Sequence, residues 1–248
     1  MLKGESQTLI DSISTGCRSL DEALGGGIPL GKVTLIYGEA STGKTTLAMS
    51  SVVNYLRPER GGASPLRRAL YVDSDRKFSL PRFSQIAGAK TNEFLKRLIL
   101  CMPRDFAEQT RLIEGLESFT VGDIRLVALD TITSLYSEEV ASTGKVFPTN
   151  RELNRQLAYL KEAAESRGLG VLLLSQVHST LQPDQPPVTP VSSRLLRYWS
   201  DIILRLDLTS QAGVRTATLE KPKGGIVGCR FRLAPSGLID MGFLQNPL

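Results

Sequence analysis

The sequence predicts an α/β fold: a mostly parallel central sheet with helices on both faces and an antiparallel C-terminal extension. Short, nearly continuous apolar segments alternate with amphipathic stretches, which indicates strands joined by crossover helices because parallel neighbours need such connections. A glycine-rich segment joins the first apolar run to the next amphipathic stretch. The last third of the chain holds strand-like segments separated by glycine and proline, with no helical pattern between them.

The core strands are expected to be short and buried on both faces, because their segments are apolar almost throughout. They are predicted at residues 33–37, 69–73, 124–129 and 170–174, and residues 98–100 are a candidate fifth strand.

Two helices have a recognisable N-terminus. Asp105 is followed three residues later by Glu108, which is the capping-box pattern, and Thr149 with Glu152 repeats it. In the second helix, apolar residues then fall on one face until Gly168 ends the helix. Both helices are predicted to cover the sheet.

The C-terminal third is predicted to extend the sheet with antiparallel strands at residues 202–206, 214–219 and 231–233. Two stretches have the composition of loops, residues 57–67 and the proline-rich residues 178–193. Loops of that length inside a domain are usually functional.

Length and composition indicate one soluble domain that spans residues 1–248, with 1–12 as a short N-terminal extension. No apolar run reaches the ~18 residues that a membrane helix needs. The first residues have no secretory signal pattern, so we expect a cytoplasmic protein with no membrane partner. The net charge of +5 permits a polyanionic partner without requiring one.

Cysteine and histidine usage excludes several kinds of site. Cys17, Cys101 and Cys229 are odd in number and form no C-x-x-C pair, which argues against a zinc site and a disulfide framework. His178 is the single histidine, which argues against a histidine-centred triad and a histidine-rich metal site.

A phosphate-binding loop follows the first predicted strand. Its pattern is G-x-x-x-x-G-K-T, and a helix is expected directly after it, so that backbone N–H groups converge on phosphate oxygens. Lys44 is predicted to reach the β- and γ-phosphates of ATP, and the Thr45 hydroxyl to bind Mg²⁺. The expected nucleotide-binding residues of the loop are Gly38, Glu39, Ala40, Ser41, Thr42, Gly43, Lys44, Thr45 and Thr46.

Acidic and amide side chains end three other predicted strands. Asp130 follows residues 124–129 and is expected to hold Mg²⁺ through water. Asp73 and Asp75 end a second strand, and either could point into the crevice at the carboxyl edge of the sheet. Gln176 lies at the same edge, where an amide could sense the γ-phosphate; a polar strand terminus without function is its alternative.

The segments 14–27 and 33–45 resemble the opening of the RecA/RadA recombinase ATPase core. Residues 130–136 are similar to the family's Mg²⁺-carboxylate strand and the start of its first DNA loop. Residues 175–178 resemble the segment that carries its γ-phosphate-sensing glutamine, just before the second DNA loop. The similarity in order and spacing runs from about residue 13 to residue 240.

Residues 102–106 and 237–240 are most similar to the short archaeal paralogues of RadA within that family. Few residues precede the core, so the resemblance implies no separate N-terminal DNA-binding domain and no F-x-x-A oligomerisation segment. Stable filaments are therefore less favoured than for RadA, and a weak homo-oligomer remains open.

One departure from the family concerns the catalytic base. The family usually has Asp-Thr-Glu, with the glutamate activating water, where this chain has Asp73-Ser74-Asp75. Asp75 is then the catalytic carboxylate, one methylene short, and a misplacement of about 1 Å can lower a rate on the order of a hundredfold. We therefore expect ATP to be bound tightly and hydrolysed slowly.

Three more cations follow from the resemblance. Lys221 and Lys223 match two lysines that bacterial RecA offers to the ATP of a neighbouring protomer, although a solvated basic turn would explain them equally. Arg82 matches the position from which RadA-type proteins stack a guanidinium on adenine.

The family's DNA loops correspond to residues 136–150 and 178–197. Cations beside aromatic groups suit single-stranded DNA bound without sequence preference, with duplex DNA as a second option. Tyr198 and Trp199 precede a buried strand, which favours a core position for them. The candidate DNA-binding residues are Lys145, Arg151, His178, Arg194 and Arg197.

The resemblance thus implies a weak, DNA-dependent ATPase that binds ATP and Mg²⁺ and assists a RadA-type recombinase. A KaiC-like signalling ATPase or autokinase is the alternative, but it would normally show tandem domains or paired catalytic glutamates. A small-molecule P-loop kinase would need an arginine-rich lid, which the sequence lacks.

Overall fold

The computed structural model describes residues 12–57, 67–119, 124–179, 188–222 and 228–244. Its centre is a nine-stranded sheet in the order β13-β12-β11-β10-β3-β7-β6-β4-β5. These strands are β3 (Val33–Gly38), β4 (Arg68–Asp73), β5 (Leu98–Cys101), β6 (Ile124–Asp130), β7 (Gly170–Ser175), β10 (Ile202–Leu208), β11 (Val214–Lys221), β12 (Gly228–Ala234) and β13 (Gly237–Phe243).

The strands from β3 to β5 in that order are parallel, as predicted, and the candidate fifth strand is real. The C-terminal extension is antiparallel from β10 to β13. One detail differs from the prediction: β10 itself is parallel to β3 and antiparallel to β11, so it joins the two parts of the sheet. β13 was missed, because its apolar residues are interrupted by Asp240 and Gly242.

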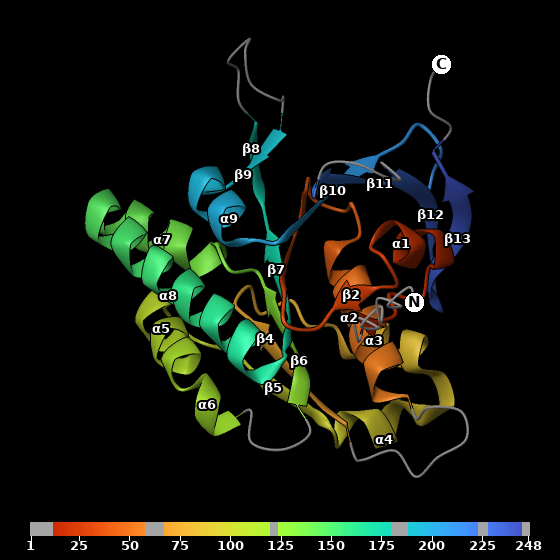
Figure 1. Cartoon of the computed structure of the whole chain (residues 1–248), viewed down its shortest axis with the longest axis horizontal. Coiled ribbons are helices and arrows are strands. Elements are labelled where there is room, and N and C mark those ends of the chain that lie inside the picture. The colour runs from red at the N-terminus through yellow and green to blue at the C-terminus, as the bar shows by residue number, and fades with distance from the viewer. Residues whose placement is uncertain (1–11, 58–66, 120–123, 180–187, 223–227, 245–248) are drawn as a thin grey trace, which may run out of the picture.

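Helices cover both faces of the sheet (Figure 1). One face carries α1, α2, α3 and α4, and the other carries α5, α7, α8 and α9. The helices are α1 (Arg18–Ala23), α2 (Lys44–Leu56), α3 (Leu80–Ala87), η1 (Gly88–Lys90), α4 (Thr91–Leu95), α5 (Phe106–Glu114), α6 (Leu116–Phe119), α7 (Ser134–Thr143), α8 (Val146–Arg167) and α9 (Ser193–Trp199). Two small sheets pair β1 (Ser12–Ile13) with β2 (Ile28–Pro29), and β8 (Val177–Ser179) with β9 (Val188–Pro190).

The alternation of side chains along the parallel strands divides the core into two layers. Ile36 and Ala128 pack with α2 on one side, while Leu35 and Val127 pack with α8 on the other. Strands that are buried on both faces need apolar residues at successive positions, which explains the continuous runs in the sequence.

The cap of α5 is confirmed: the Glu108 backbone N–H donates to Asp105 Oδ1 at 2.7 Å. The predicted cap at Thr149 is wrong, because α8 begins at Val146 and the Thr149 hydroxyl donates to Lys145 O at 2.6 Å. Pro148 lies in the first turn of this helix, where its missing N–H has no partner to lose.

The first segment assigned to a DNA loop, residues 136–150, is mostly helical, since α7 and the start of α8 occupy it. The second contains β9 and α9, and part of it lies outside the described residues, as does most of the predicted loop 57–67. No helix in the described ranges is long and apolar enough to cross a membrane.

Candidate functional site

The phosphate loop runs from the end of β3 to the start of α2, as the sequence predicts. Gly38 lies so close to β10 that a Cβ atom there would be 2.2 Å from Leu206 O. Gly43, with φ +99°, would bring a Cβ to 2.9 Å from the Leu233 side chain. Side chains are excluded at both positions, so the backbone of the loop is free to approach a phosphate group.

Lys44 is the first residue of α2, and its side chain turns back over the loop. Its Nζ donates to the carbonyl oxygens of Gly38 and Glu39, both at 2.7 Å. Burial lowers the pKa of the Lys44 ammonium, and the carboxylates of Asp130 and Asp75 oppose that shift. The cation and two acidic groups from other strands therefore share one electrostatic environment.

Asp130 ends β6 directly beside the start of α2. The Tyr71 hydroxyl donates to its Oδ2 at 2.6 Å, and Thr45 also hydrogen-bonds to the carboxylate. Asp130 is only 7% exposed, and burial raises the pKa of its carboxyl. A buried carboxylate is costly without a partner, and a bound cation would supply one. The Asp130 carboxylate and the Thr45 hydroxyl at the N-terminus of α2 are oxygen ligands of the kind that Mg²⁺ prefers in a nucleotide complex.

The two aspartates after β4 have different roles. Asp73 is buried and accepts hydrogen bonds from the backbone N–H groups of Lys77 and Phe78, at 3.0 and 2.7 Å. It therefore caps the turn that follows the strand. Asp75 is instead the carboxylate that faces the crevice, and its Oδ2 lies 3.1 Å from Lys77 Nζ.

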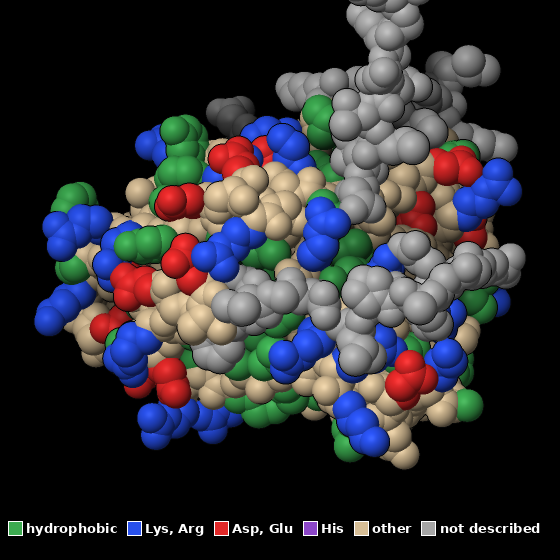
Figure 2. All heavy atoms as spheres, turned by 60° about the horizontal axis from the view of Figure 1, so that its bottom comes forward, with side chains coloured by type: hydrophobic (Ala, Val, Ile, Leu, Met, Phe, Trp, Pro, Cys, Tyr) green, Lys and Arg blue, Asp and Glu red, His purple; other side chains and the backbone are tan. Residues whose placement is uncertain are grey.

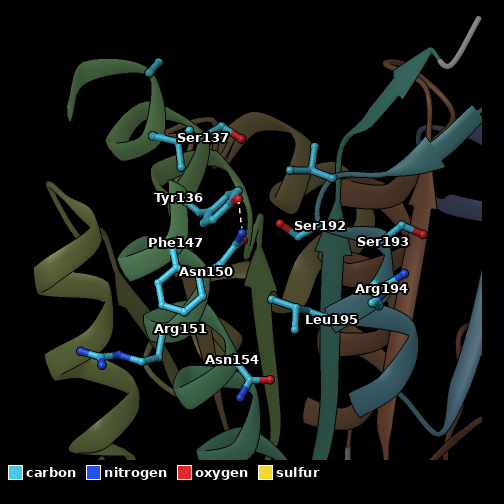
Figure 3. A pocket seen from close by; sticks show the side chains of 13 residues that line it. Tyr136, Ser137, Phe147, Asn150, Arg151, Asn154, Ser192, Ser193, Arg194 and Leu195 are labelled. Atoms are coloured by element: carbon cyan, nitrogen blue, oxygen red, sulfur yellow. Dashed lines mark hydrogen bonds between the residues drawn. The ribbon is translucent and has the colours of Figure 1, made fainter. Parts of the chain in front are cut away.

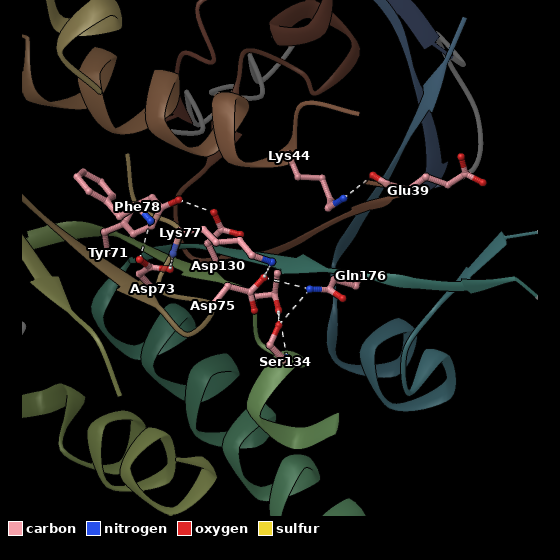
Figure 4. Close-up of polar contacts among 11 residues, drawn as sticks. Glu39, Lys44, Tyr71, Asp73, Asp75, Lys77, Phe78, Asp130, Ser134 and Gln176 are labelled. Atoms are coloured by element: carbon pink, nitrogen blue, oxygen red, sulfur yellow. Dashed lines mark hydrogen bonds and ion pairs between the residues drawn. The ribbon is translucent and has the colours of Figure 1, made fainter. Parts of the chain in front are cut away.

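Gln176 meets Asp75 across the edge of the sheet, and Figure 4 shows the two side chains pointing toward each other. The Gln176 amide donates to Asp75 Oδ2 at 3.0 Å and to Ser134 Oγ at 3.3 Å. Asp75, Ser134 and Gln176 line a cavity of 660 Å³. A carboxylate and an amide side by side are suited to orienting a water molecule for in-line attack on a phosphate.

Tyr71 and Arg215 lie at the site and were missed in the sequence. Tyr71 reads as an apolar core residue of β4, and nothing local reveals that its hydroxyl meets Asp130. Arg215 lies on β11, far along the chain, yet it lines a cavity of 330 Å³ together with Lys44, Thr45 and Thr46. Only the pairing of the C-terminal strands brings it there.

Of the three cations inferred by resemblance, two lie in the described part of the chain. Lys221 Nζ donates to the carbonyl oxygens of Arg197 and Ser200 at the end of α9, at 3.4 and 2.5 Å. Arg82 lies on α3 and donates to Pro235 O at 3.2 Å. Lys223 falls outside the described residues. The roles toward a neighbouring ATP and toward adenine stay predictions.

A cavity of 890 Å³ lies between α7, α8 and the β9–α9 segment, and Figure 3 looks into it. Arg151 and Arg194 line it, both exposed, and neither has an ion-pair partner among the described residues. Phe147, 79% exposed, lines it as well. Two of the predicted DNA-binding cations are thus brought to one hollow beside an exposed aromatic ring.

Arg197 points elsewhere. Its guanidinium pairs with Glu220 at 2.8 Å and lies over the Tyr37 ring, 5.5 Å from the centroid. These contacts favour a structural role over contact with DNA. Lys145 is exposed at the start of α8, and His178 lies on β8, where only its backbone is described.

The expectation that Tyr198 and Trp199 are core residues is wrong for Tyr198, which is 73% exposed. Trp199 is half-buried and donates from Nε1 to Asn154 Oδ1 at 2.9 Å. α9 is a short surface helix in which consecutive side chains are about 100° apart, so the two neighbours have different exposure.

Comparison with known proteins gives one consistent result. The sequence model of the Rad51 family matches residues 6–241. The DNA repair and recombination protein RadB of Thermococcus onnurineus is 36% identical over 236 residues, which cover 92% of this chain and 97% of that protein. RadB of Methanosphaera stadtmanae is 30% identical over 225 residues, or 89% and 93% of the two chains. A crystal structure of the RadB recombinase has a TM-score of 0.76 and 32% identity, and the match covers 92% of this chain and 99% of that one.

Proposed function

The chain belongs to the Rad51 family, and from that premise we propose that it is an ATP-binding, weakly hydrolysing accessory protein of homologous recombination and DNA repair. It binds DNA and acts as a mediator for a RadA-type recombinase. Members of the family are ATPases, and the similar RadB proteins are described as DNA repair and recombination proteins. The observation that carries the proposal is that Lys44, at the start of α2, lies near Asp130 and Asp75, and that Gln176 hydrogen-bonds to Asp75.

In this proposal each residue has one task. The phosphate loop, residues 38–46, holds the phosphates of ATP, with Lys44 on the β- and γ-phosphates. Thr45 and Asp130 hold Mg²⁺. Asp75, together with Gln176, orients the water that attacks the γ-phosphate, and Gln176 also senses that phosphate. Release of the γ-phosphoryl group changes the charge in the crevice.

The function is proposed to depend on the binding of ATP, which switches the conformation of the protein, more than on the hydrolysis of ATP. Asp75 has one methylene less than glutamate, so its reach toward the water is shorter. A protein whose two conformations differ in ATP affinity shifts between them on binding alone.

DNA is proposed to bind at Lys145, Arg151 and Arg194, with His178 and Arg197 as weaker candidates. The ligand is single-stranded DNA, with duplex DNA as a second option, recognised through its phosphates without base sequence. Figure 2 shows another face of the molecule, where on the coloured part lysine and arginine are interspersed with acidic side chains.

The proposal has four further parts. The chain is a single ATPase domain that self-associates only weakly. The Arg82 guanidinium stacks on the adenine of ATP, and Lys221 and Lys223 contact the ATP of a neighbouring protomer.

The test is ATPase activity with and without single-stranded DNA, for the wild type and for Lys44→Ala. We expect slow hydrolysis that DNA accelerates and that Lys44→Ala abolishes, together with co-purification of a RadA-type recombinase that depends on bound nucleotide. Transfer of phosphate to the protein itself would favour a KaiC-like autokinase, and stimulation by a small acceptor instead of DNA would favour a small-molecule kinase.

A further inference from the structure

Arg215 lies over the phosphate loop from a distant part of the chain. It stands on β11, and its Nε donates to Ser41 O at 3.0 Å, while its Nη1 donates to Val214 O at 2.8 Å. Ser41 has φ +63° at the apex of the loop. The N–H of Thr42, in the same rigid peptide plane as the Ser41 carbonyl, donates to Glu39 O at 3.4 Å. Arg215 therefore braces a turn of the loop that a backbone hydrogen bond closes from the other side.

The surroundings of Arg215 leave its charge without a counter-ion. Both of its hydrogen-bond acceptors are neutral carbonyl groups, and Arg215 makes no ion pair with any carboxylate in the described ranges. The described residues that line its cavity hold a second cation, Lys44, and no acidic side chain. Lys44 has the carboxylates of Asp130, Asp75 and Glu39 near it, whereas Arg215 has no ion-pair partner in the described ranges. A ligand that brings negative charge would therefore stabilise Arg215.

The cavity that Arg215 lines adjoins the phosphate loop. Arg215 shares it with Thr45 and Thr46, the second and third residues of α2, and with Leu233, which packs against Gly43. Guanidinium groups bind phosphate through paired N–H donors. The side chain uses Nε and Nη1 for hydrogen bonds to the protein, and Nη2 makes none with the described residues.

We propose that Arg215 is a second phosphate-binding cation of the nucleotide site, holding the phosphate loop through Ser41 and contacting a phosphate oxygen of bound ATP or ADP. The inference rests on the proposed function, since it requires that ATP binds at residues 38–46. It adds that the antiparallel extension of the sheet, through β11, takes part in nucleotide recognition.

Arg215→Gln separates the two tasks of the side chain. The Gln Nε2 atom is the same number of bonds from Cα as Arg Nε, so the bond to Ser41 O is retained while the charge is removed. We expect ATP and ADP to bind about ten- to a hundredfold more weakly by calorimetry, the range for a lost hydrogen bond to a charged group. Affinity for adenosine and the melting temperature without nucleotide are expected to be unchanged.

The matched control is Arg230→Ala. Arg230 on β12 is paired with Thr216, the neighbour of Arg215, and therefore lies on the opposite face of the sheet. It is exposed, and its replacement is expected to leave ATP affinity unchanged.

Wild-type affinity for ATP in Arg215→Gln, or an equal loss for adenosine and ATP, overturns the inference and leaves Arg215 as a brace for the loop. Should Arg215→Gln fail to fold, Arg215→Lys carries the test, because it removes the Nε donor but keeps the charge. Retained ATP affinity then supports the inference, and a loss of tenfold or more overturns it. Absence of ATP binding in the wild type contradicts the proposed function itself, and that result needs no variant.

Discussion

In the proposed function, Asp75 is the side chain that orients the water attacking the γ-phosphate of ATP. The carboxylate is held between Lys77 and Gln176, at 3.1 and 3.0 Å, and its side chain is 11% exposed. These contacts fix its direction, so the length of the side chain decides how far it reaches toward a water molecule at the γ-phosphate.

Replacing Asp75 with glutamate is expected to raise the ATP turnover rate by about tenfold or more, because it restores the missing methylene. ATP affinity should stay near that of the wild type, since Asp75 is not part of the phosphate loop. Steady-state ATPase assays and nucleotide titrations check both. Asp75→Asn, which keeps the length and removes the charge, is the control and should lower turnover. A wild-type rate in Asp75→Glu would count against Asp75 as the base.

Asp130 shows a conflict between stability and function. Burial raises the pKa of this carboxyl, so the native state binds its proton more tightly than the unfolded chain does. The free energy of unfolding therefore decreases as the pH rises from the pKa of the unfolded state, about 3.9, to the pKa of the native state. Above the native pKa the full cost of burying the ionised carboxylate is present.

Asp130→Asn removes this penalty and is expected to increase the free energy of unfolding at pH 7. The difference from the wild type should shrink as the pH falls through the native pKa and disappear below about 3.9, where the carboxyl is protonated in both the native and the unfolded state. The same variant should lose Mg²⁺-dependent ATP binding. Urea unfolding as a function of pH, with nucleotide titration, measures both; a variant less stable than the wild type at pH 7 would refute the argument.

At the scale of the elements, the sequence predicts what depends on local pattern. The parallel strands follow from their apolar runs, and the phosphate loop follows from its glycines and Lys44. The start of α8 was misplaced because Thr149 satisfies the pattern of a cap, whereas the cap position is Lys145 and the helix begins four residues earlier than predicted. Arg215 and the network around Arg197 depend on strand pairing, which no local pattern encodes.

The cap of α5 is a direct test of such a local rule. Asp105→Ala is expected to lower the free energy of unfolding by about 1 kcal/mol, the usual effect of removing an N-cap. Arg111→Ala, at an exposed position of the same helix, serves as the control and should change stability little. Chemical denaturation of both variants measures the difference; equal effects would mean that the cap contributes nothing.

At the scale of the whole molecule, the two arginines of α9 divide between binding and stability. Arg194 is exposed and unpaired within the described residues, whereas Arg197 joins α9 to β3 and β11 through Tyr37 and Glu220. The same helix can therefore attach to the sheet with one residue and present a cation to a ligand with another.

Arg194→Ala is expected to weaken binding to single-stranded DNA and to reduce the slope of log affinity against log salt by about 0.7, the value for one lost phosphate contact. Arg197→Ala should leave that slope unchanged and lower the melting temperature. Fluorescence anisotropy over a salt series and thermal unfolding separate the two. A reduced slope in Arg197→Ala would restore it as a DNA contact.

The position of β3 within the sheet also has a consequence for synthesis of the chain. Both neighbours of this strand come far later in the sequence: Thr34 pairs with Leu172 of β7 and with Ile202 of β10. While the protein emerges from the ribosome, the strand that leads into the phosphate loop has no partner until most of the chain has been made. Contacts this distant in sequence form slowly. The nucleotide site is therefore expected to be among the last parts to become native, so ATP can stabilise the finished fold but cannot guide its early steps.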